Sequence, residues 1–522
     1  MINIQRIPDD FFVIGEPSPA RDWEVSFSLT GTGLEVSLCA KESKPRFVCL
    51  RWNYRTEEPV RVLGDKWERA YADLTWKSLD GENFMPWYFL ATNGRDTVGC
   101  GVMTRPNSFV SFEYDASGVS GWFDVRCGDA GVELGGRKLL IGTVVTREYP
   151  GVGSFEAACR FCRELCPDPI LPSEPVYGGN NWYYAYGKSS AEQIYSDSRL
   201  IASLAEGNKV RPFMVIDDCW QKNSCAGPWV PNEAFGDMKT VADTMKSIGV
   251  RPGIWVRFLN DPEFAAKHPD WLVRQKYLDP SVPEVSEYIS GVISDIKSWG
   301  FELLKHDYTT FDLFGEFAFE LNGTITRTPD WAFHNRTKTS AEIVLDLYRL
   351  IRQACGDMIV IGCNTVSHLC AGLVEINRTG DDTSGTDWNR TRAMGVNTLA
   401  FRLPQNRAFY MSDADCVGII PGKIDWSLNR EWTRLLSKSG TPLFISCPAG
   451  GLSGEAFSEM KEAFRYAGAQ TDSAVPLDWE YNNQPQRWLI NGKEEKFDFV
   501  QTSYPRILDS VFNRSSHIER ED

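Results

Sequence analysis

Histidine is scarce in this sequence, and the features that accompany several common chemistries are missing. The 522 residues include five histidines, which form no metal-binding or triad pattern, so a zinc site or a histidine-based triad has little support. No glycine-rich phosphate loop occurs, which argues against nucleotide chemistry. The sequence therefore predicts no metal and no organic cofactor. The histidines are His268, His306, His334, His368 and His517.

Positive charge is in deficit. Lys and Arg number 55 against 70 Asp and Glu, a net charge of −15. Nucleic acid and anionic membrane surfaces are recognised by cationic faces, so neither is an expected partner. No apolar run is long enough to span a membrane, and residues 1–8 lack the basic and apolar regions of a signal peptide. A cytoplasmic protein is expected, although a chain whose leader had been removed would read the same.

The 14 cysteines follow no disulfide or metal-ligand pattern. Cys159, Cys162 and Cys166 share a helical spacing, but no second ligand pair or histidine accompanies them. They are expected to be small apolar side chains on a buried helix face, with no metal. The 18 tryptophans, by contrast, suit stacking on sugar rings, although on composition alone core packing is the favoured explanation.

The pattern of apolar and polar residues changes along the chain and predicts an α/β protein with a (β/α)8 TIM barrel. Residues 1–152 alternate apolar and polar residues between short turns, which is typical of an N-terminal β-sandwich. Residues 153–175 form a helical and proline-rich linker. Residues 176–470 alternate apolar strands with helical segments, as a barrel requires. Residues 471–522 are expected to form a small C-terminal β region, with strands at Gln486–Ile490 and Phe497–Gln501.

Eight short apolar runs are predicted as the barrel strands. They are Val176–Trp182, Pro212–Asp217, Pro252–Val256, Phe301–Asp307, Met358–Cys363, Leu373–Arg378, Ala408–Met411 and Pro442–Ser446.

Polar and aromatic side chains stand where these strands end. In a (β/α)8 barrel the carboxyl ends of the strands surround the active site, so these groups are expected to converge. Individually, each has a structural alternative: the adjacent acids after the second strand could cap a helix, Lys305 and Asp307 could form an ion pair, and the acids after Arg378 could lie in a surface turn. The groups are Asp217, Asp218, Trp220, Trp255, Arg257, Lys305, Asp307, Cys363, Asn364, Arg378, Asp381 and Asp382.

Alternation along a strand places Lys305 and Asp307 on one face and His306 on the other, so His306 is expected to point toward the helices as a core residue. The remaining set of carboxylates, aromatic rings and one lysine is the set that glycoside hydrolysis uses, in which one carboxylate attacks and one carboxyl group delivers a proton.

The motifs around these residues resemble glycoside hydrolase family 36, the α-galactosidases (melibiases), which share a clan with family 27. Asp217-Asp-Cys-Trp220 resembles the family's Asp-Asp-Gly-Trp, and His268-Pro-Asp-Trp271 resembles its His-Pro-Asp-Trp. Leu303-Leu-Lys-His-Asp307 resembles its nucleophile strand. Asn377-Arg-Thr-Gly-Asp-Asp-Thr383 resembles its acid/base segment, and Tyr410–Cys416 resembles a downstream Asn-Asp-Pro-Asp-Cys segment. The resemblance covers about residues 176–450.

The resemblance implies a retaining α-galactosidase that releases terminal galactose from oligosaccharides or glycoconjugates. Asp307 would be the nucleophile, ionised beside Lys305. Asp382, four residues beyond Arg378, would be the acid/base and be held neutral by its surroundings, with Asp381 as the competing residue. Asp217 and Asp218 would hold the 4- and 6-hydroxyls, and Lys305 the 3- and 4-hydroxyls. Trp182, Trp220 and Trp255 would wall the ring, with Cys363, Asn364 and Arg378 near the 2-position.

Some residues depart from the family pattern and leave alternatives open. Cys219 replaces a glycine, and Arg257 stands on the leaving-group side, where relatives carry an acid or an apolar residue. The same machinery could act on an α-N-acetylgalactosaminide or a β-L-arabinopyranoside. It could also transfer sugar, as raffinose synthases do, with Trp388 and Trp331 as an acceptor site. A decayed barrel that only binds carbohydrate is a third reading. The family often forms oligomers, so a homo-oligomer is an open expectation.

Overall fold

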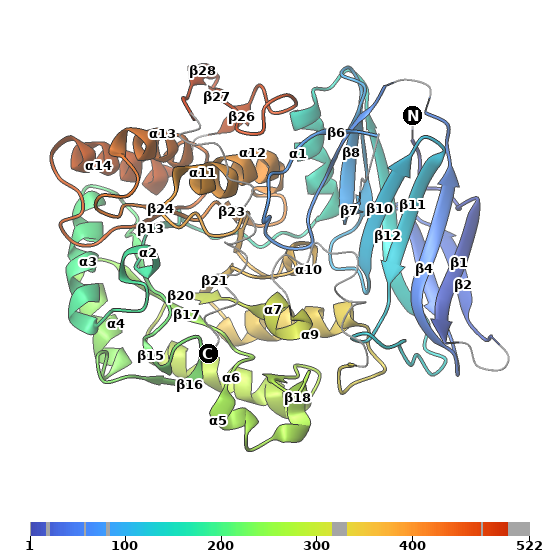
Figure 1. Ribbon diagram of the computed structural model, residues 1–522, viewed down its shortest axis with the longest axis horizontal. Coiled ribbons are helices and arrows are strands. Elements are labelled where there is room, and N and C mark those ends of the chain that lie inside the picture. The colour runs from blue at the N-terminus through green and yellow to red at the C-terminus, as the bar shows by residue number, and fades with distance from the viewer. Residues whose placement is uncertain are drawn as a thin grey trace.

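The computed structural model describes residues 2–16, 21–56, 59–79, 84–315, 331–470 and 473–499. Two antiparallel sheets occupy one end of the molecule and a parallel barrel the other (Figure 1). The predicted fold class, an α/β barrel with an N-terminal pair of antiparallel sheets, is confirmed. His517 and most of the expected C-terminal region lie outside the described residues.

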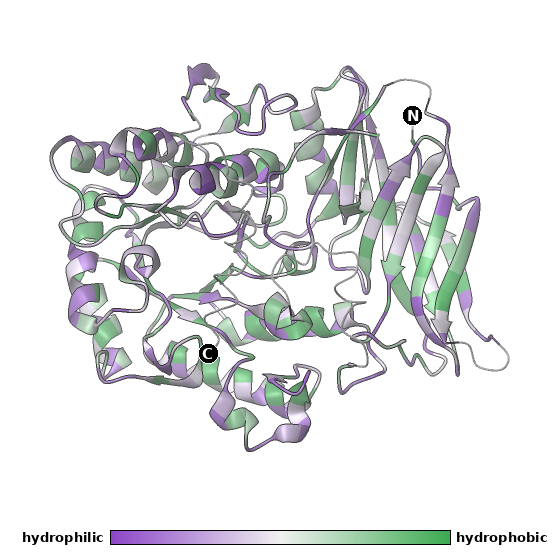
Figure 2. Cartoon of the chain, in the orientation of Figure 1, coloured by the Kyte–Doolittle hydropathy of each residue, from purple (hydrophilic) through white to green (hydrophobic). Residues whose placement is uncertain are grey.

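The N-terminal region forms two antiparallel sheets that pack face to face. Phe89 of one sheet contacts Phe112 of the other, with ring centroids 5.8 Å apart. Hydrophobic and hydrophilic residues alternate along these strands, as expected when one face of a sheet is buried (Figure 2). The first sheet contains, in order, β1 (Asp10–Glu16), β4 (Lys44–Asn53), β11 (Gly118–Asp124), β10 (Phe109–Asp115) and β7 (Met85–Pro86). The second contains β2 (Glu24–Leu29), β3 (Leu34–Cys39), β12 (Leu139–Tyr149), β9 (Thr97–Val102), β8 (Tyr88–Thr92), β5 (Arg61–Gly64) and β6 (Lys77–Ser78).

Helix α1 (Ser154–Leu165) follows the sheets and covers the second of them, where Phe161 fits against Gly99 of β9. Cys162 and Cys166 are buried and Cys159 is half-buried, so they act as apolar side chains, as predicted. The helix ends before the proline-rich stretch that leads into the barrel.

All neighbouring strands of the barrel pair in parallel, and the sheet closes on itself. Its two end strands, β23 (Met411–Asp413) and β24 (Cys416–Gly418), are separated in the chain by only two residues, so together they make the seventh strand. A separate apolar cluster fills the interior, with Val215, Leu303 and Phe444 among its members. The other strands, in sheet order, are β22 (Ile376–Arg378), β21 (Ile359–Gly362), β20 (Leu303–His306), β17 (Arg251–Val256), β14 (Phe213–Ile216), β13 (Tyr177–Asn180) and β25 (Leu443–Ser446).

Helices surround the barrel strands (Figure 1). The longer ones carry buried apolar stripes, as amphipathic helices covering a sheet do. They are α3 (Ala191–Leu204), α4 (Met238–Ile248), α6 (Pro283–Ser298), α9 (Ser340–Cys355), α13 (Trp426–Ser437) and α14 (Gly454–Ala469). Shorter helices are α2 (Trp182–Ala185), α5 (Pro262–Ala265), α7 (Thr309–Phe314), α10 (Ser367–Cys370), α11 (Trp388–Thr391) and α12 (Thr398–Arg402).

Three smaller antiparallel sheets lie outside the sandwich and the barrel in the described part of the chain. β15 (Gln221–Asn223) pairs with β16 (Ala226–Pro231), and β18 (Leu272–Val273) pairs with β19 (Tyr277–Leu278). At the C-terminal end, β26 (Ala474–Pro476), β27 (Arg487–Ile490) and β28 (Lys493–Lys496) form an antiparallel sheet. The strand expected at Phe497–Gln501 is wrong for residues 497–499, which follow β28 without strand structure; residues 500–501 lie outside the described range.

A segment of the N-terminal region between β5 and β6, residues 65–76, docks on the barrel. Ala70 N donates to Thr379 O at 2.9 Å, and Asp381 N donates to Ala70 O at 2.8 Å. Arg402 of α12 donates to Asp65 Oδ1 at 3.0 Å and to the Glu68 carbonyl at 2.6 Å. These bonds hold the segment beside the residues that follow β22.

Candidate active site

Four of the predicted site residues lie half-buried at the carboxyl end of the barrel. Lys305 and Asp307 come from the end of β20, Trp182 begins α2 after β13, and Asp382 follows β22. The other predicted residues of this site are more deeply buried around them, apart from Asp381. The sequence-predicted residues are therefore brought to one end of the barrel, with the half-buried groups at the end of β20 and in the segments that follow β13 and β22.

Asp307 is held in place by two donors. Trp255 Nε1 donates to its Oδ2 at 3.2 Å, and the backbone N of Tyr308 donates to its Oδ1 at 2.8 Å. Burial alone would raise its pKa, but the cationic Arg69 and Lys305 outweigh burial and lower the pKa below its ordinary value. Asp307 is thus ionised at neutral pH, as the sequence predicted.

Lys305 pairs with Asp217 instead of directly with Asp307. Its Nζ lies 2.7 Å from Asp217 Oδ2, and the Lys305 side chain is 13% exposed. Burial opposes the lysine charge, but Asp217 outweighs it and raises the pKa of Lys305. Asn180 at the end of β13 also donates to Asp217 Oδ2, at 2.6 Å.

Asp218 is occupied by the loop that follows it. Its Oδ1 accepts from Cys219 N at 2.7 Å, from Gln221 Nε2 at 2.6 Å and from Cys225 N at 2.9 Å. Its Oδ2 accepts from Ser224 Oγ at 3.2 Å and from Cys225 Sγ at 2.9 Å. A carboxylate offers about four lone-pair sites, so these bonds fill its capacity. Asp218 acts here as the anchor of the loop.

The adjacent acids after β22 have different surroundings. Asp381 bridges two arginines, with Arg69 Nη2 at 3.1 Å and Arg390 Nη2 at 2.6 Å. Asp382 is 30% exposed and meets Arg378 at 3.2 Å and Arg69 at 3.5 Å. Of the two, Asp382 is the more accessible and more loosely held carboxylate.

The expectation that Asp382 is held neutral is wrong. Burial raises its pKa, but Arg69, Arg378, Lys305 and Arg390 together lower it well below the ordinary value. Since opposite charges within a few ångströms favour the ionised form, the carboxylate is charged in this structure.

Sequence reasoning missed Arg69, because nothing in the N-terminal region marks one arginine in a loop as part of a site more than 300 residues further along the chain. Its neighbours Glu68 and Tyr71 were missed for the same reason. Asn364 Nδ2 donates to Tyr71 Oη at 2.8 Å and lies 3.3 Å from the Glu68 carboxylate. Asn364 is fully buried by these contacts.

Arg378 is connected to a second missed carboxylate, Asp415, which lies between β23 and β24. Its Nη2 lies 3.2 Å from Asp415 Oδ2, and its Nη1 donates to Cys363 Sγ at 3.4 Å. Tyr183 and the Thr383 backbone also bond to Asp415. The motif at Tyr410–Cys416 was the available signal for Asp415. These bonds fix Arg378 and the chain that leads to Asp382.

Several predicted substrate contacts are buried among protein groups. Arg257 is 3% exposed and donates to both oxygens of Asp312, from Nη2 at 2.6 Å and from Nε at 3.0 and 3.1 Å. Trp220 is fully buried, with its indole NH donating to the Trp255 carbonyl at 2.8 Å. Trp388 is 4% exposed. Trp331 packs against Phe314 and Phe333. These positions suit roles behind the site better than contact with a sugar.

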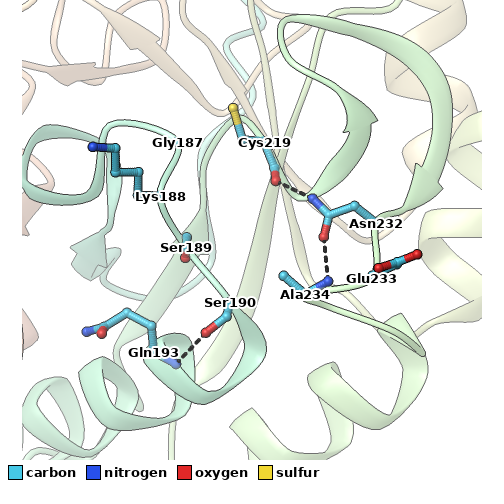
Figure 3. A pocket seen from close by; sticks show the side chains of 9 residues that line it. All are labelled: Gly187, Lys188, Ser189, Ser190, Gln193, Cys219, Asn232, Glu233 and Ala234. Carbon is cyan, nitrogen blue, oxygen red and sulfur yellow. Dashed lines mark hydrogen bonds between the residues drawn. The ribbon is translucent and has the colours of Figure 1, made fainter.

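A surface pocket of about 640 Å³ opens between the loops that follow β13 and β14 (Figure 3). Cys219 and Asn232 lie on one side and Lys188 and Gln193 on the other, and Asn232 donates to the Cys219 carbonyl at 2.7 Å. Beside this pocket, Trp182 stacks on Tyr186 with ring centroids 4.7 Å apart.

Neither a metal site nor a membrane-spanning helix is found among the residues that the structure describes. No group of three or more His, Cys, Asp or Glu side chains there could hold a metal ion. Nor is any helix within the described ranges long and apolar enough to cross a membrane.

No protein-family model matches the chain, and no curated protein matches it in sequence. Its structure is nevertheless similar to those of α-galactosidases. The enzyme from Thermus thermophilus, solved with p-nitrophenyl α-D-galactopyranoside, gives a TM-score of 0.61 at 15% identity, covering 93% of this chain and 99% of that one. The GH36 α-galactosidase from Geobacillus stearothermophilus gives 0.60 at 14% identity, covering 92% and 77%. The α-galactosidase from Lactobacillus brevis gives 0.59 at 13%, covering 91% and 72%. The chain therefore has the fold of the GH36 α-galactosidases.

Proposed function

We propose that this protein is a retaining α-galactosidase, with Asp307 as nucleophile and Asp382 as general acid/base. The observation that carries the proposal is a pair of half-buried carboxylates at the carboxyl end of a barrel with the α-galactosidase fold: Asp307 at the end of β20, and Asp382 after β22, whose charge raises the pKa of Asp307. Two carboxyl groups are what the double-displacement mechanism requires.

In this mechanism, ionised Asp307 attacks the anomeric carbon while the bond to the departing oxygen breaks. Asp382 gives that oxygen a proton, and a glycosyl-enzyme forms. Asp382 then takes a proton from water, which attacks the same carbon and releases Asp307 and the sugar with its original configuration. Because the surrounding cations lower the pKa of Asp382, substrates that need a proton on the leaving group should be hydrolysed best at acidic pH.

Accessibility supports Asp382 over Asp381 as the acid/base. Asp381 is fixed between two arginines and its side chain is 13% exposed, against 30% for Asp382. Asp382 is among the groups whose charge raises the pKa of Asp307. The acid/base must reach the leaving oxygen on the face of the sugar opposite the one that the nucleophile attacks.

Galactose is supported by the Lys305–Asp217 pair, which offers a donor and an acceptor close together to neighbouring sugar hydroxyls. Trp182, half-buried and stacked on Tyr186, provides an apolar wall for the ring.

A β-L-arabinopyranoside is a second candidate. It matches galactose at C1–C4 but lacks C6. The resemblance assigns Asp218 to the 4- and 6-hydroxyls, yet its oxygens are filled by Gln221, Ser224 and Cys225. A site in which Asp218 is less able to bind the 6-hydroxyl should discriminate less between galactose and β-L-arabinopyranose.

The test is hydrolysis of a panel of aryl α- and β-glycosides, with the product anomer followed by NMR. Release of α-galactose from an aryl α-galactoside supports the proposal. Absence of turnover across the panel, with galactose still bound, would show that the barrel only binds sugar. Transfer to added sugar at high concentration would show a transglycosidase.

Small-residue variants with azide separate the two carboxylate roles. In Asp307→Gly, azide replaces the nucleophile and should give the β-galactosyl azide. In Asp382→Gly with an aryl substrate, azide attacks the glycosyl-enzyme and should give the α-galactosyl azide. Asp381→Gly is the matched control and should give neither product. If Asp381→Gly produced the α-azide and Asp382→Gly did not, the acid/base assignment would pass to Asp381.

A further inference from the structure

Arg69 is the residue through which the N-terminal region reaches the active site. Its Nη2 lies 3.1 Å from Asp381 Oδ1, and its Nη1 lies 3.5 Å from Asp382 Oδ1. Nη1 also donates to Cys363 Sγ at 3.4 Å, and Nε to Tyr71 Oη at 3.1 Å. The side chain is 7% exposed, so this cation is almost withdrawn from water.

The backbone around Arg69 leaves the side chain little freedom. Ala70 makes the two backbone bonds to Thr379 and Asp381 described above, and Arg402 binds the carbonyl of Glu68. The segment that carries the guanidinium is thus hydrogen-bonded to the chain that carries Asp381 and Asp382.

Asp382 is surrounded by charged groups from several elements. Arg69 and Arg378 approach its carboxylate, Arg390 donates to its backbone carbonyl at 2.6 Å, and Lys305 lies nearby on β20. Its acidic and phenolic neighbours are Asp307, Tyr183, Tyr308 and, through Arg378, Asp415. Arg69 is the cation in this set that the barrel does not supply.

Resting on the proposed role of Asp382, we propose that Arg69 is a positioning residue that holds the Asp382 carboxylate in place and ionised, so that the N-terminal region sets the pH range of hydrolysis.

Asp381 completes this arrangement. When Asp382 takes up a proton during the reaction, it loses its attraction for Arg69. A buried cation without a partner is costly, but Arg69 keeps Asp381 at the shorter distance of 3.1 Å. The acid at position 381 therefore lets Asp382 change its protonation state without leaving Arg69 unpaired.

The test compares Arg69→Gln, Arg69→Lys and Asp381→Asn through the pH dependence of kcat/KM on an aryl α-galactoside and on an unactivated one. Removing an opposite charge at this distance raises a carboxyl pKa by about one unit or more. Arg69→Gln should therefore move both limbs of the profile to higher pH by about one unit. Arg69→Lys should move them less, and Asp381→Asn should move them to lower pH because Asp382 loses a competitor for Arg69.

Arg402→Gln is the matched control for a merely structural role. It removes another buried arginine that ties down the same segment, without removing a charge that contacts Asp382. It should lower stability and leave the pH limbs in place. A folded Arg69→Gln enzyme whose profile superimposes on that of the wild type would overturn the proposal.

A second measurement keeps the two proposals distinguishable. In protein labelled with ¹³C-aspartate, the Asp382 carboxyl signal, assigned with Asp382→Asn, can be titrated with and without Arg69→Gln. An upward shift supports the role of Arg69 even if no glycoside in the panel is hydrolysed, in which case only the proposed function fails. An unchanged titration overturns the role of Arg69 whatever the enzyme hydrolyses.

Discussion

Replacing Arg257 by Met should destabilise the protein strongly and change substrate affinity little. Arg257 and Asp312 are 4% and 1% exposed, and three bonds of 2.6 to 3.1 Å join them. The guanidinium also lies 4.0 Å from the centre of the Tyr308 ring. Removing one partner of a buried pair costs about 3–5 kcal/mol, because the other charge stays buried without compensation. Arg257→Met should therefore lower the free energy of unfolding by about that amount.

The double variant Arg257→Met/Asp312→Leu should recover most of this loss, since it leaves no unpaired charge. The matched control is Lys222→Met, which breaks the exposed pair with Glu263 and should cost about 1 kcal/mol or less. Urea denaturation of the four proteins measures the unfolding free energies, and kinetics on an aryl galactoside measures KM. If Arg257→Met were nearly as stable as the wild type and raised KM tenfold, Arg257 would be a substrate contact and the structural reasoning would fail.

Two further perturbations test Asp307 and the core beneath it. Trp255→Phe removes the indole NH that donates to Asp307 at 3.2 Å. Because a hydrogen bond to a charged group contributes about 1.5–3 kcal/mol, kcat/KM should fall about tenfold or more. Unchanged kinetics would contradict this role of Trp255. Burial lowers the pKa of His306 to about 4, whereas the unfolded chain titrates near its ordinary value. Stability is therefore lost as pH falls below the unfolded value, by about 2 kcal/mol between pH 7 and pH 5. His306→Phe should remove that part of the pH dependence in urea denaturation, and an unchanged slope would refute the assignment.

The barrel could be predicted because buried parallel strands are apolar runs with polar residues at their carboxyl ends. The seventh strand was predicted at Ala408–Met411 and overlaps the observed one only at Met411. Ser412 and Asp413 lie in β23 and Asp415 lies between β23 and β24, and hydropathy does not predict a strand from such polar residues. Burial there raises the pKa of Asp413 to about 6, against the opposing effect of Arg378.

The predicted site residues separate according to their surroundings. Sequence placed Asp307 and Asp382 at strand ends, and the barrel brings them to its mouth. The sequence also grouped Arg257, Trp220 and Trp388 with these carboxylates, but the structure buries all three side chains. Their exposure depends on which neighbouring segments cover the strand ends, and this is decided by the tertiary structure. Asp218 was predicted as a sugar ligand, and only the three-dimensional path of the loop through Cys225 shows how its oxygens are filled.

The sequence by itself determined the fold class, the order of the barrel strands and the carboxylates that could do chemistry, because local hydropathy and strand-end position carry that information. The tertiary structure decided the charge state of those carboxylates. Whether Asp382 is neutral or ionised depends on Arg69, more than 300 residues away in the chain, and on Arg378 and Arg390 around it. Electrostatic interactions depend on distance in space, and sequence separation does not report it.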